Sequence, residues 1–185
     1  MSLPQAREAL LTGEDLYRRP DLGSCELVNG RVIPMAPTGR PHATIESRLT
    51  SRLQIWADET GRGEVMNGEA GIYIRRSPDT VRAADLLFMS HERCARCSES
   101  GYLDVAPELV VEVLSPEDRW SYVTEKIDDY FSAGVERVWI VDPRKRGVLV
   151  YHSPSVSEAF TVGEILRDES LLPGFSLDLS YLFQS

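Results

Sequence analysis

The sequence predicts an α/β (or α+β) protein in which helices flank a mixed β-sheet. Two nearly continuous apolar segments, 109–114 and 138–141, are typical of strands that are covered on both faces. The segment between them has apolar residues at helical spacing, and Asn29-Gly30 separates two short apolar segments as in a β-hairpin. The length of 185 residues fits one domain, which we expect to span residues 1–185.

The first part of the chain is expected to form a short helix and a hairpin. Residues 12–19 fit a short capped helix that Pro20 ends. The hairpin strands are residues 25–28 and 31–35, and Asn29-Gly30 between them is the strongest two-residue hairpin signal in the chain.

A long helix and two strands are expected next. Residues 42–60 fit a helix with an apolar stripe, and Gly61 ends it. Strands are expected at residues 69–75 and 82–89. Residues 90–104 are polar and fit a connecting loop with one helical turn.

The central apolar strand at 109–114 leads into a second helix. Ser115-Pro116 predicts the start of that helix, with Ser115 as N-cap and Pro116 at the first helical position. Gly134 is its expected C-terminal stop. The residues of its buried stripe are Val123, Ile127, Tyr130 and Phe131.

The rest of the chain is expected to be mostly strand. The buried strand at 138–141 is followed by a turn at 142–147 and a hairpin strand at 148–151. One more strand is expected near Phe160, and residues 171–183 form a closing segment.

The charge of the chain restricts the kinds of partner it can have. Hydrophobic residues make up 42% and charged residues 26%, which excludes disordered and fibrous classes. The net charge is −9, and residues 98–136 alone hold 10 acids and 2 bases, a local net charge of −8. This acidity argues against a protein that coats nucleic acid non-specifically, because such binding depends on Lys and Arg. It does not exclude a nuclease, since a divalent-metal site is itself built from carboxylates.

Three features bear on the compartment. No apolar stretch approaches the roughly 18 residues that a membrane helix needs. The N-terminus lacks the basic-then-apolar pattern of a signal peptide. Cys25, Cys94 and Cys97 are too few and too unevenly placed for a disulfide scaffold. We therefore expect a cytoplasmic protein.

Three acidic residues stand out because their neighbours are apolar: Glu26, Asp85 and Glu112. An ionised carboxylate in such surroundings needs a cation, strong hydrogen-bond donors or a raised pKa. For a single acid, the alternative is an edge position or an ion pair with one of the 18 arginines. For Asp85 and Glu112 together, on two central strands, a Mg²⁺ or Mn²⁺ site is the favoured interpretation.

Lys126 is one of only two lysines in the chain. If a helix starts at Ser115 and folds back over the strand, Lys126 lies about 16 Å along the helix and Glu112 about 10 Å along the strand. The Lys126 side chain leans toward the helix N-terminus and can span the difference of about 6 Å. The alternative is an exposed lysine paired with Asp129 on its own helix.

Motifs distributed over the chain resemble one known family. They are Glu26-Leu27-Val28-Asn29-Gly30, His42, Asp85, Pro107-Glu108-Leu109-Val110-Val111-Glu112-Val113-Leu114-Ser115-Pro116, Lys126 with Tyr130, and Val138-Trp139-Ile140-Val141-Asp142-Pro143. Together they resemble the Uma-type restriction endonuclease family of the PD-(D/E)XK nuclease superfamily. The resemblance covers roughly residues 12–183, and residues 107–143 are its specific part.

This resemblance implies a restriction-endonuclease-like core and metal-dependent hydrolysis of DNA phosphodiester bonds. It implies that Asp85 and Glu112 hold Mg²⁺ (or Mn²⁺), with the Val113 carbonyl as a third ligand. It further implies that Lys126 orients the attacking water and steadies the developing negative charge, with Glu26 completing the site. Phosphate hydrolysis needs these two functions, an activated water and a cationic clamp.

The sequence departs from the superfamily pattern at two positions and in its charge. Leu114 stands where the motif has Lys, so Lys126 must replace it, and Ala84 stands where Pro usually precedes the strand Asp. The acidic segment is unfavourable for DNA unless arginines form a positive face. The candidates for that face are Arg40, Arg48, Arg75, Arg76 and Arg82.

Several weaker signals remain open. Cys94 and Cys97, with His91 and Cys25, have the residue types of a zinc site, although a second matched pair is missing. His42 fits either a phosphate contact or a structural role. Base stacking is conceivable for Trp120, Tyr122 and Tyr130, but aromatic residues at helical spacing are more often core. The candidate nucleic-acid contacts are His42, Arg75, Arg76 and Tyr130.

Two functional hypotheses follow from the sequence. The first is a metal-dependent DNA endonuclease, which intact Asp85, Glu112 and Lys126 favour. The second is a non-catalytic nuclease-like module that binds nucleic acid or a protein partner, which the acidic charge favours. A homodimer is expected in either case, because two symmetric sites are the simplest way to cut both strands.

Overall fold

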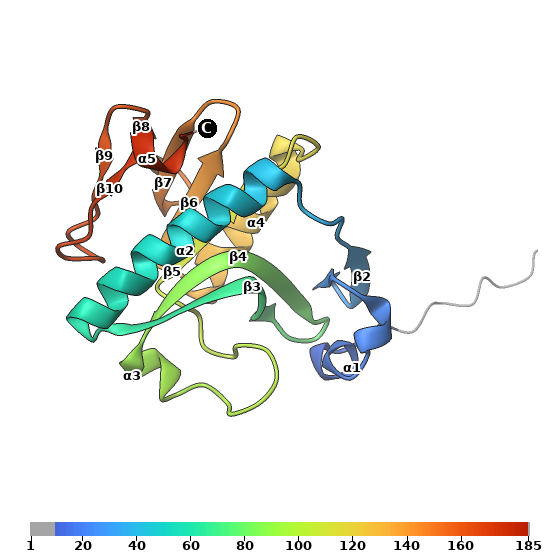
Figure 1. Ribbon diagram of the computed structural model, residues 1–185. Coiled ribbons are helices and arrows are strands. Elements are labelled where there is room, and N and C mark those ends of the chain that lie inside the picture. The colour runs from blue at the N-terminus through green and yellow to red at the C-terminus, as the bar shows by residue number, and fades with distance from the viewer. Residues whose placement is uncertain (1–9, 185) are drawn as a thin grey trace, which may run out of the picture.

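The computed structural model describes residues 10–184 and contains a mixed sheet flanked by helices (Figure 1). This arrangement confirms the predicted fold class. The strands, in sheet order, are β2 (Arg31–Pro34), β1 (Cys25–Val28), β4 (Thr80–Ser90), β5 (Leu109–Val113), β6 (Arg137–Asp142), β7 (Gly147–Ser153) and β8 (Val156–Thr161), while β3 (Gly63–Arg75) pairs with β4. Only β5 and β6 pair in parallel; the other pairings in this sheet are antiparallel.

Strand β4 lies at a fork in the sheet. Strand β3 pairs with one edge of β4 over most of its length. The other edge is shared by two strands, since β1 meets it at Val81 and β5 pairs with Leu86–Phe88. Between these contacts, residues 82–85 of β4 have no strand partner on that edge in the described part of the chain. This gap is where the candidate site lies.

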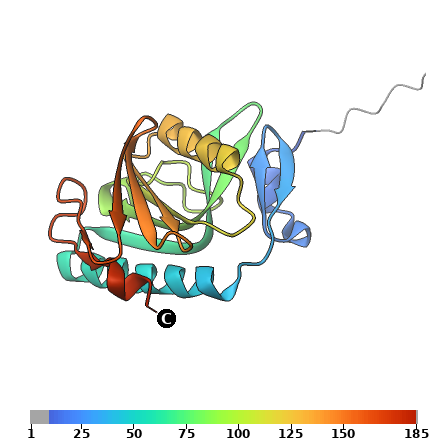
Figure 2. The ribbon, with the colours of Figure 1, turned by 90° about the horizontal axis from the view of Figure 1, so that it is seen from above.

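The two long helices cover opposite faces of the sheet, as Figure 2 shows. Helix α2 (Arg40–Thr60) packs Leu49, Leu53 and neighbouring residues on the face that carries Val111 and Val113 of β5. Helix α4 (Trp120–Ala133) covers the other face, where its apolar stripe meets Val110. The prediction that the strand at 109–114 is covered on both faces is therefore confirmed.

The C-terminal segment completes the core on the α2 side. It contains β9 (Ile165–Leu166), which pairs with β10 (Leu177–Asp178), and then α5 (Leu179–Leu182). Phe175 and other apolar residues of this segment pack with Trp139 and with helix α2. Within residues 10–184, no helix is both long enough and apolar enough to cross a bilayer.

Short elements and turns follow local sequence signals. Helix α1 (Gly13–Tyr17) is capped by the Thr12 side chain, a 3₁₀ turn follows at Pro20–Leu22, and α3 (His91–Cys94) is capped by Ser90. In the β1–β2 turn, Asn29 and Gly30 have φ of 52° and 74°, the left-handed values of a type I′ hairpin. The predicted hairpin and the helical turn in the 90–104 loop are thus confirmed.

The start of helix α4 differs from the prediction. The helix begins at Trp120 with Arg119 as N-cap, so Ser115 is not an N-cap and Pro116 is not the first helical residue. The physical reason is Asp118, whose carboxylate accepts the Ser115 N–H at 2.7 Å and closes a turn before the helix. Lys126 lies seven residues after the observed cap, about 10 Å along the helix rather than the roughly 16 Å expected for a helix that starts at Ser115.

Strand β3 is longer than predicted and starts at Gly63 rather than at residue 69. A register shift between Asn67 and Ala70 breaks the alternation that identifies a strand in the sequence. Gly68 and Glu69 at this bulge both have positive φ, 80° and 64°. Helix α2 likewise begins at Arg40, two residues before the predicted start.

Candidate active site

Side chains of the site satisfy the backbone groups that the fork in the sheet leaves unpaired. The Ala83 N–H donates to Glu26 Oε1 at 3.0 Å, and Lys126 Nζ donates to the Ala83 carbonyl at 3.3 Å. At the end of β5, the Val113 N–H donates to Asp85 Oδ2 at 2.7 Å. Buried backbone groups need such partners, so the fork places carboxylates from three strands and a lysine from α4 together.

Lys126 lies between two of the predicted acids. Its Nζ is 2.8 Å from Glu112 and 3.2 Å from Glu26 Oε1. The Tyr130 hydroxyl donates to Glu112, and the Tyr122 hydroxyl donates to Glu26. The alternative in which Lys126 is an exposed residue paired with Asp129 is therefore wrong: its ammonium reaches back to the strand, as the leaning of helical side chains predicts.

The environment of Glu112 favours its protonated form. Burial raises its pKa to about 7, the nearby Asp85 carboxylate contributes to the increase, and Lys126 opposes it. For Lys126, burial would lower the pKa, but the carboxylates of Glu112 and Glu26 outweigh burial and raise it. The ammonium therefore stays charged, and the site contains more acidic groups than this one cation balances.

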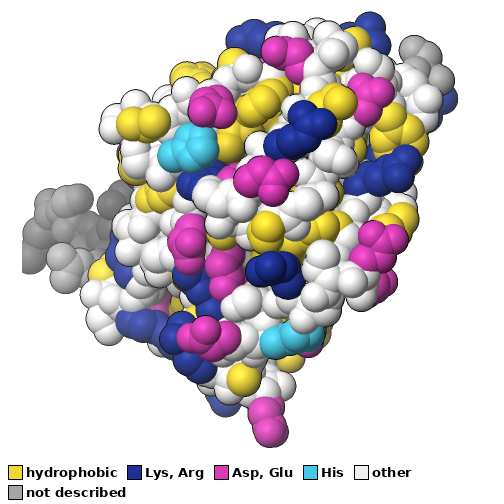
Figure 3. Space-filling model, turned by 90° about the vertical axis from the view of Figure 1, so that its left-hand side faces the viewer, with side chains coloured by type: hydrophobic (Ala, Val, Ile, Leu, Met, Phe, Trp, Pro, Cys, Tyr) yellow, Lys and Arg dark blue, Asp and Glu magenta, His cyan; other side chains and the backbone are white. Residues whose placement is uncertain are grey.

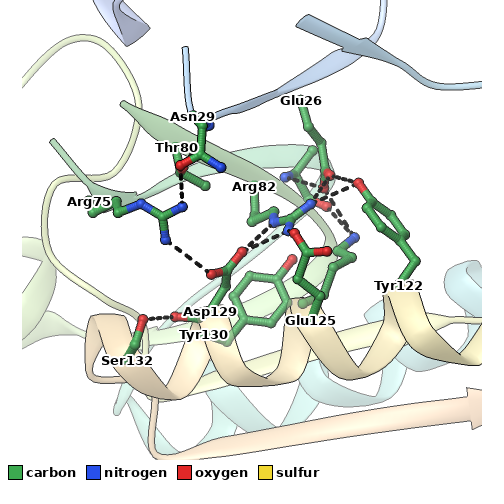
Figure 4. A network of polar contacts seen from close by, with 12 residues as sticks. Glu26, Asn29, Arg75, Thr80, Arg82, Tyr122, Glu125, Asp129, Tyr130 and Ser132 are labelled. Carbon is green, nitrogen blue, oxygen red and sulfur yellow. Dashed lines mark hydrogen bonds and ion pairs between the residues drawn. The ribbon is translucent and has the colours of Figure 1, made fainter. Parts of the chain in front are cut away.

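Arg82 forms ion pairs with a second group of acids next to Lys126 (Figure 4). Its guanidinium is fully buried and lies 2.9 Å from Glu26, 2.7 Å from Asp129 and 2.6 Å from Glu125. Burial would raise the pKa of Glu26, but Lys126 and Arg82 lower it. For Glu26 the ion-pair alternative thus holds. The suggestion that Arg82 belongs to a positive surface is wrong, because its side chain is fully buried.

His42 reaches the site from the first turn of helix α2. It is 6% exposed, and its Nε2 lies 3.2 Å from Asp85 Oδ2. Its Nδ1 is buried, has no hydrogen-bond partner among residues 10–184, and lies 3.8 Å from Glu46, one turn further along α2. Burial would lower the pKa of His42, but the contact with Asp85 raises it. His42 thus holds Asp85 in place from the helix side.

A cavity of about 570 Å³ opens onto these groups. Glu26, Asp85, Glu112 and Lys126 all line it, together with His42 and Val113. The structure therefore brings together all four residues predicted to be catalytic and the three predicted to be metal ligands.

The donor set fits a hard divalent cation. Two carboxylates and a main-chain carbonyl leave positions for water and phosphate oxygens, which is how Mg²⁺ is usually held. Asp85 Oδ1 accepts no hydrogen bond within the described part of the chain, whereas both oxygens of Glu112 are bonded. Among residues 10–184, no three His, Cys, Asp or Glu side chains lie close enough to hold an ion by themselves.

The predicted nucleic-acid contacts have varied surroundings. Tyr130 is fully buried, so it offers no ring face to a nucleic acid. Arg75 is half exposed and pairs with Asp129, and Arg76 pairs with Glu14; neither lines the cavity. On the face that Figure 3 shows, acidic and basic side chains lie next to one another. The described residues form no continuous basic patch there.

The cysteines suggested for zinc are packed in a different way. Cys94 and Cys97 contact Met89 and lie against the apolar cluster under helix α4. Burial raises the pKa of both thiols, which disfavours the thiolate that a metal needs.

Three residues of the site have roles that the sequence analysis did not assign. They are Arg82, Tyr122 and Glu46. Arg82 has the same signal as the buried acids, a charge within an apolar strand, and Glu46 lies four residues after His42 on one helix face. For Tyr122, no pattern indicates a bond to Glu26 across 96 residues.

Comparison with known proteins identifies the family. The sequence model of the Uma2 family, described as "Putative restriction endonuclease", matches residues 13–180. A crystal structure described as "a putative nuclease belonging to DUF820 from Anabaena variabilis" superposes with a TM-score of 0.76 at 20% sequence identity. That match covers 94% of this chain and 97% of the other, which establishes the shared fold. No curated protein matched the sequence. By the match over residues 13–180, the chain belongs to the Uma2 family.

Proposed function

We propose that this protein is a metal-dependent endonuclease that hydrolyses DNA phosphodiester bonds. The observation that carries the proposal is the position of Lys126 between Glu112 and Glu26 in a cavity that Asp85 also lines. The acidic side chains around this single ammonium suit a divalent cation, and that cation together with Lys126 would bind the anionic phosphate. Family membership supports the same proposal.

Asp85, Glu112 and the Val113 carbonyl would hold Mg²⁺ or Mn²⁺. When bound, the ion would polarise the phosphate and lower the pKa of a water molecule. Lys126 would hold a phosphate oxygen and stabilise the charge that develops on it. Glu26, fixed by Arg82 and Tyr122, would keep the Lys126 ammonium in position. Two copies of the chain would be needed to cut both strands in one encounter.

A second function is favoured by one observation. Glu26, Glu112 and Asp129 already pair with Lys126 or Arg82 within the chain, so these acids do not need an added cation as a partner. A nuclease-like module that binds nucleic acid or protein without cutting it would not need a metal ion at this site.

Plasmid nicking with Mg²⁺ or Mn²⁺ separates the two functions. The wild type should nick, and Asp85→Asn and Glu112→Gln should each abolish nicking. Glu108→Gln is the matched control, because Glu108 is a buried carboxylate paired with Arg93 outside the cavity. Nicking that survives in both site variants contradicts the mechanism, and a wild type that cuts with neither metal favours the binding module.

A further inference from the structure

The catalytic cavity continues along the surface into two further hollows. The first has a volume of about 200 Å³ and shares Met35, Glu69 and Ala83 with the cavity. The second has a volume of about 320 Å³ and shares Tyr17 and Tyr102 with the first. These hollows, which we call the tyrosine track, lead from the site to helix α1.

The end of the track is built from aromatic rings. Tyr102 meets Tyr17 and Tyr73 edge to face, with ring centroids 5.4 Å and 6.0 Å apart. Tyr17 is 55% exposed, so one of these rings is open to solvent. The Arg76 guanidinium lies over the Tyr73 ring at 3.5 Å. An exposed ring beside guanidinium groups is the usual platform for an unpaired base.

The loop that carries Tyr102 is anchored rather than free. The Tyr73 N–H donates to the Leu103 carbonyl, and the Leu103 N–H donates to the Gly71 carbonyl, each at 2.9 Å. The Tyr102 ring lies so close to Gly71 that a Cβ there would be 2.2 Å from the ring. The platform is therefore pre-formed, which reduces the entropy lost on binding.

Charge distinguishes the track from the other opening of the cavity. On the α4 side, a hollow is lined by Glu117, Asp118 and Glu125 against the single base Arg119. Along the track, three acids are balanced by three solvent-facing arginines. The acids are Glu14, Glu69 and Asp104, and the bases are Arg18, Arg19 and Arg76. A phosphodiester strand is repelled on the α4 side and not along the track.

We propose that the tyrosine track binds single-stranded DNA that adjoins the bond to be cut. An unpaired base would stack on Tyr17, and Arg18 would contact its phosphate. A duplex cannot use this platform, because its bases are already stacked on each other. This inference rests on the proposed function, since it names the form of DNA that the same site receives.

Fluorescence anisotropy with a labelled single-stranded oligonucleotide, compared with the same oligonucleotide in a duplex, tests the proposal. The protein carries Glu112→Gln and the buffer holds EDTA, so that binding is read without cleavage. Tyr17→Ala should weaken binding about tenfold, and Tyr17→Phe, which keeps the ring, should restore it. Trp120→Ala, at a similarly exposed aromatic on the α4 side, should change binding less than about twofold. Arg18→Glu should also weaken binding and should reduce its dependence on salt.

Each outcome decides the proposal. Equal affinity for single strand and duplex, or a larger effect of Trp120→Ala than of Tyr17→Ala, would overturn it. Thermal unfolding of each variant checks that the fold is intact, and Arg18→Glu keeps the test valid if Tyr17→Ala does not fold. If the wild type does not nick plasmid, only the endonuclease proposal is refuted. If it nicks plasmid but neither Tyr17→Ala nor Arg18→Glu weakens oligonucleotide binding, only the proposal that the tyrosine track binds single-stranded DNA is refuted.

Discussion

The raised pKa of Glu112 predicts that Glu112→Gln stabilises the metal-free protein at alkaline pH. A carboxyl whose folded pKa is raised supports the fold below its unfolded pKa of 4.5, and this support is lost as the pH rises through about 7. At about 1.36 kcal/mol per pKa unit, the wild type loses about 3 kcal/mol over this window. The glutamine amide of the variant would keep one oxygen acceptor for Lys126, its NH2 group would donate to the Tyr130 hydroxyl, and it would not titrate.

Urea unfolding of wild type and Glu112→Gln in EDTA, at pH 5 and pH 8.5, measures this difference. The two proteins should be similar in stability at pH 5, and the variant should be more stable by about 3 kcal/mol at pH 8.5, or about 6–12 °C in Tm. Mn²⁺ should stabilise only the wild type, because ligand binding to the folded state adds to its stability. A variant less stable than wild type at pH 8.5 would refute the reasoning, since the ion pair with Lys126 would then outweigh burial.

Three further predictions concern the stability of the fold. Asp168→Asn should cost about 3 kcal/mol at pH 7, because it leaves the largely buried Arg137 unpaired. Burial would raise the pKa of Asp168, but Arg137 and Ser170 lower it. Ionised Asp168 therefore stabilises the fold above its unfolded pKa of 3.8, and this stabilisation is lost in acid. Urea unfolding midpoints at pH 7 and pH 3 measure the difference. Arg82→Met should cost about 3–5 kcal/mol in urea unfolding, with Arg82→Lys intermediate, since only guanidinium forms the full fork. Leu53→Ala should cost about 2–5 kcal/mol by the same assay and leave the metal response unchanged, because Leu53 is fully buried against the opposite face.

Much of the fold was predictable because it depends on local signals. Asn29-Gly30 specifies its hairpin through left-handed φ, and Gly61 and Gly134 end the two long helices in the same conformation. The start of α4 was not predictable in this way. Ser115-Pro116 suits a helix start and a turn equally, and Asp118 decides between them only through its side-chain geometry.

The site residues were predictable where a charged side chain lies in an apolar segment, because a buried charge needs a partner. Their apolar neighbours in the sequence identified Glu26, Asp85 and Glu112 as candidates. The rise and side-chain direction of a helix predicted that Lys126 lies near them. The identity of the other partners depends on tertiary contacts. The position of Arg82 in an apolar strand indicates that it is buried, but nothing local shows that its partners are Glu26 and Asp129.

At residues 82–85 of β4, the same side chains that form the candidate site also hold the sheet together. Glu26 and Lys126 there take the place of a neighbouring strand, and Asp85 ties down the end of β5. Enzymes often gain stability when catalytic residues are replaced, because those residues are held in strained settings. Here, truncating Glu26, Lys126 or Asp85 to alanine would strip main-chain groups of their partners. Selection for a stable fold would then preserve these three side chains whether or not the protein cuts DNA.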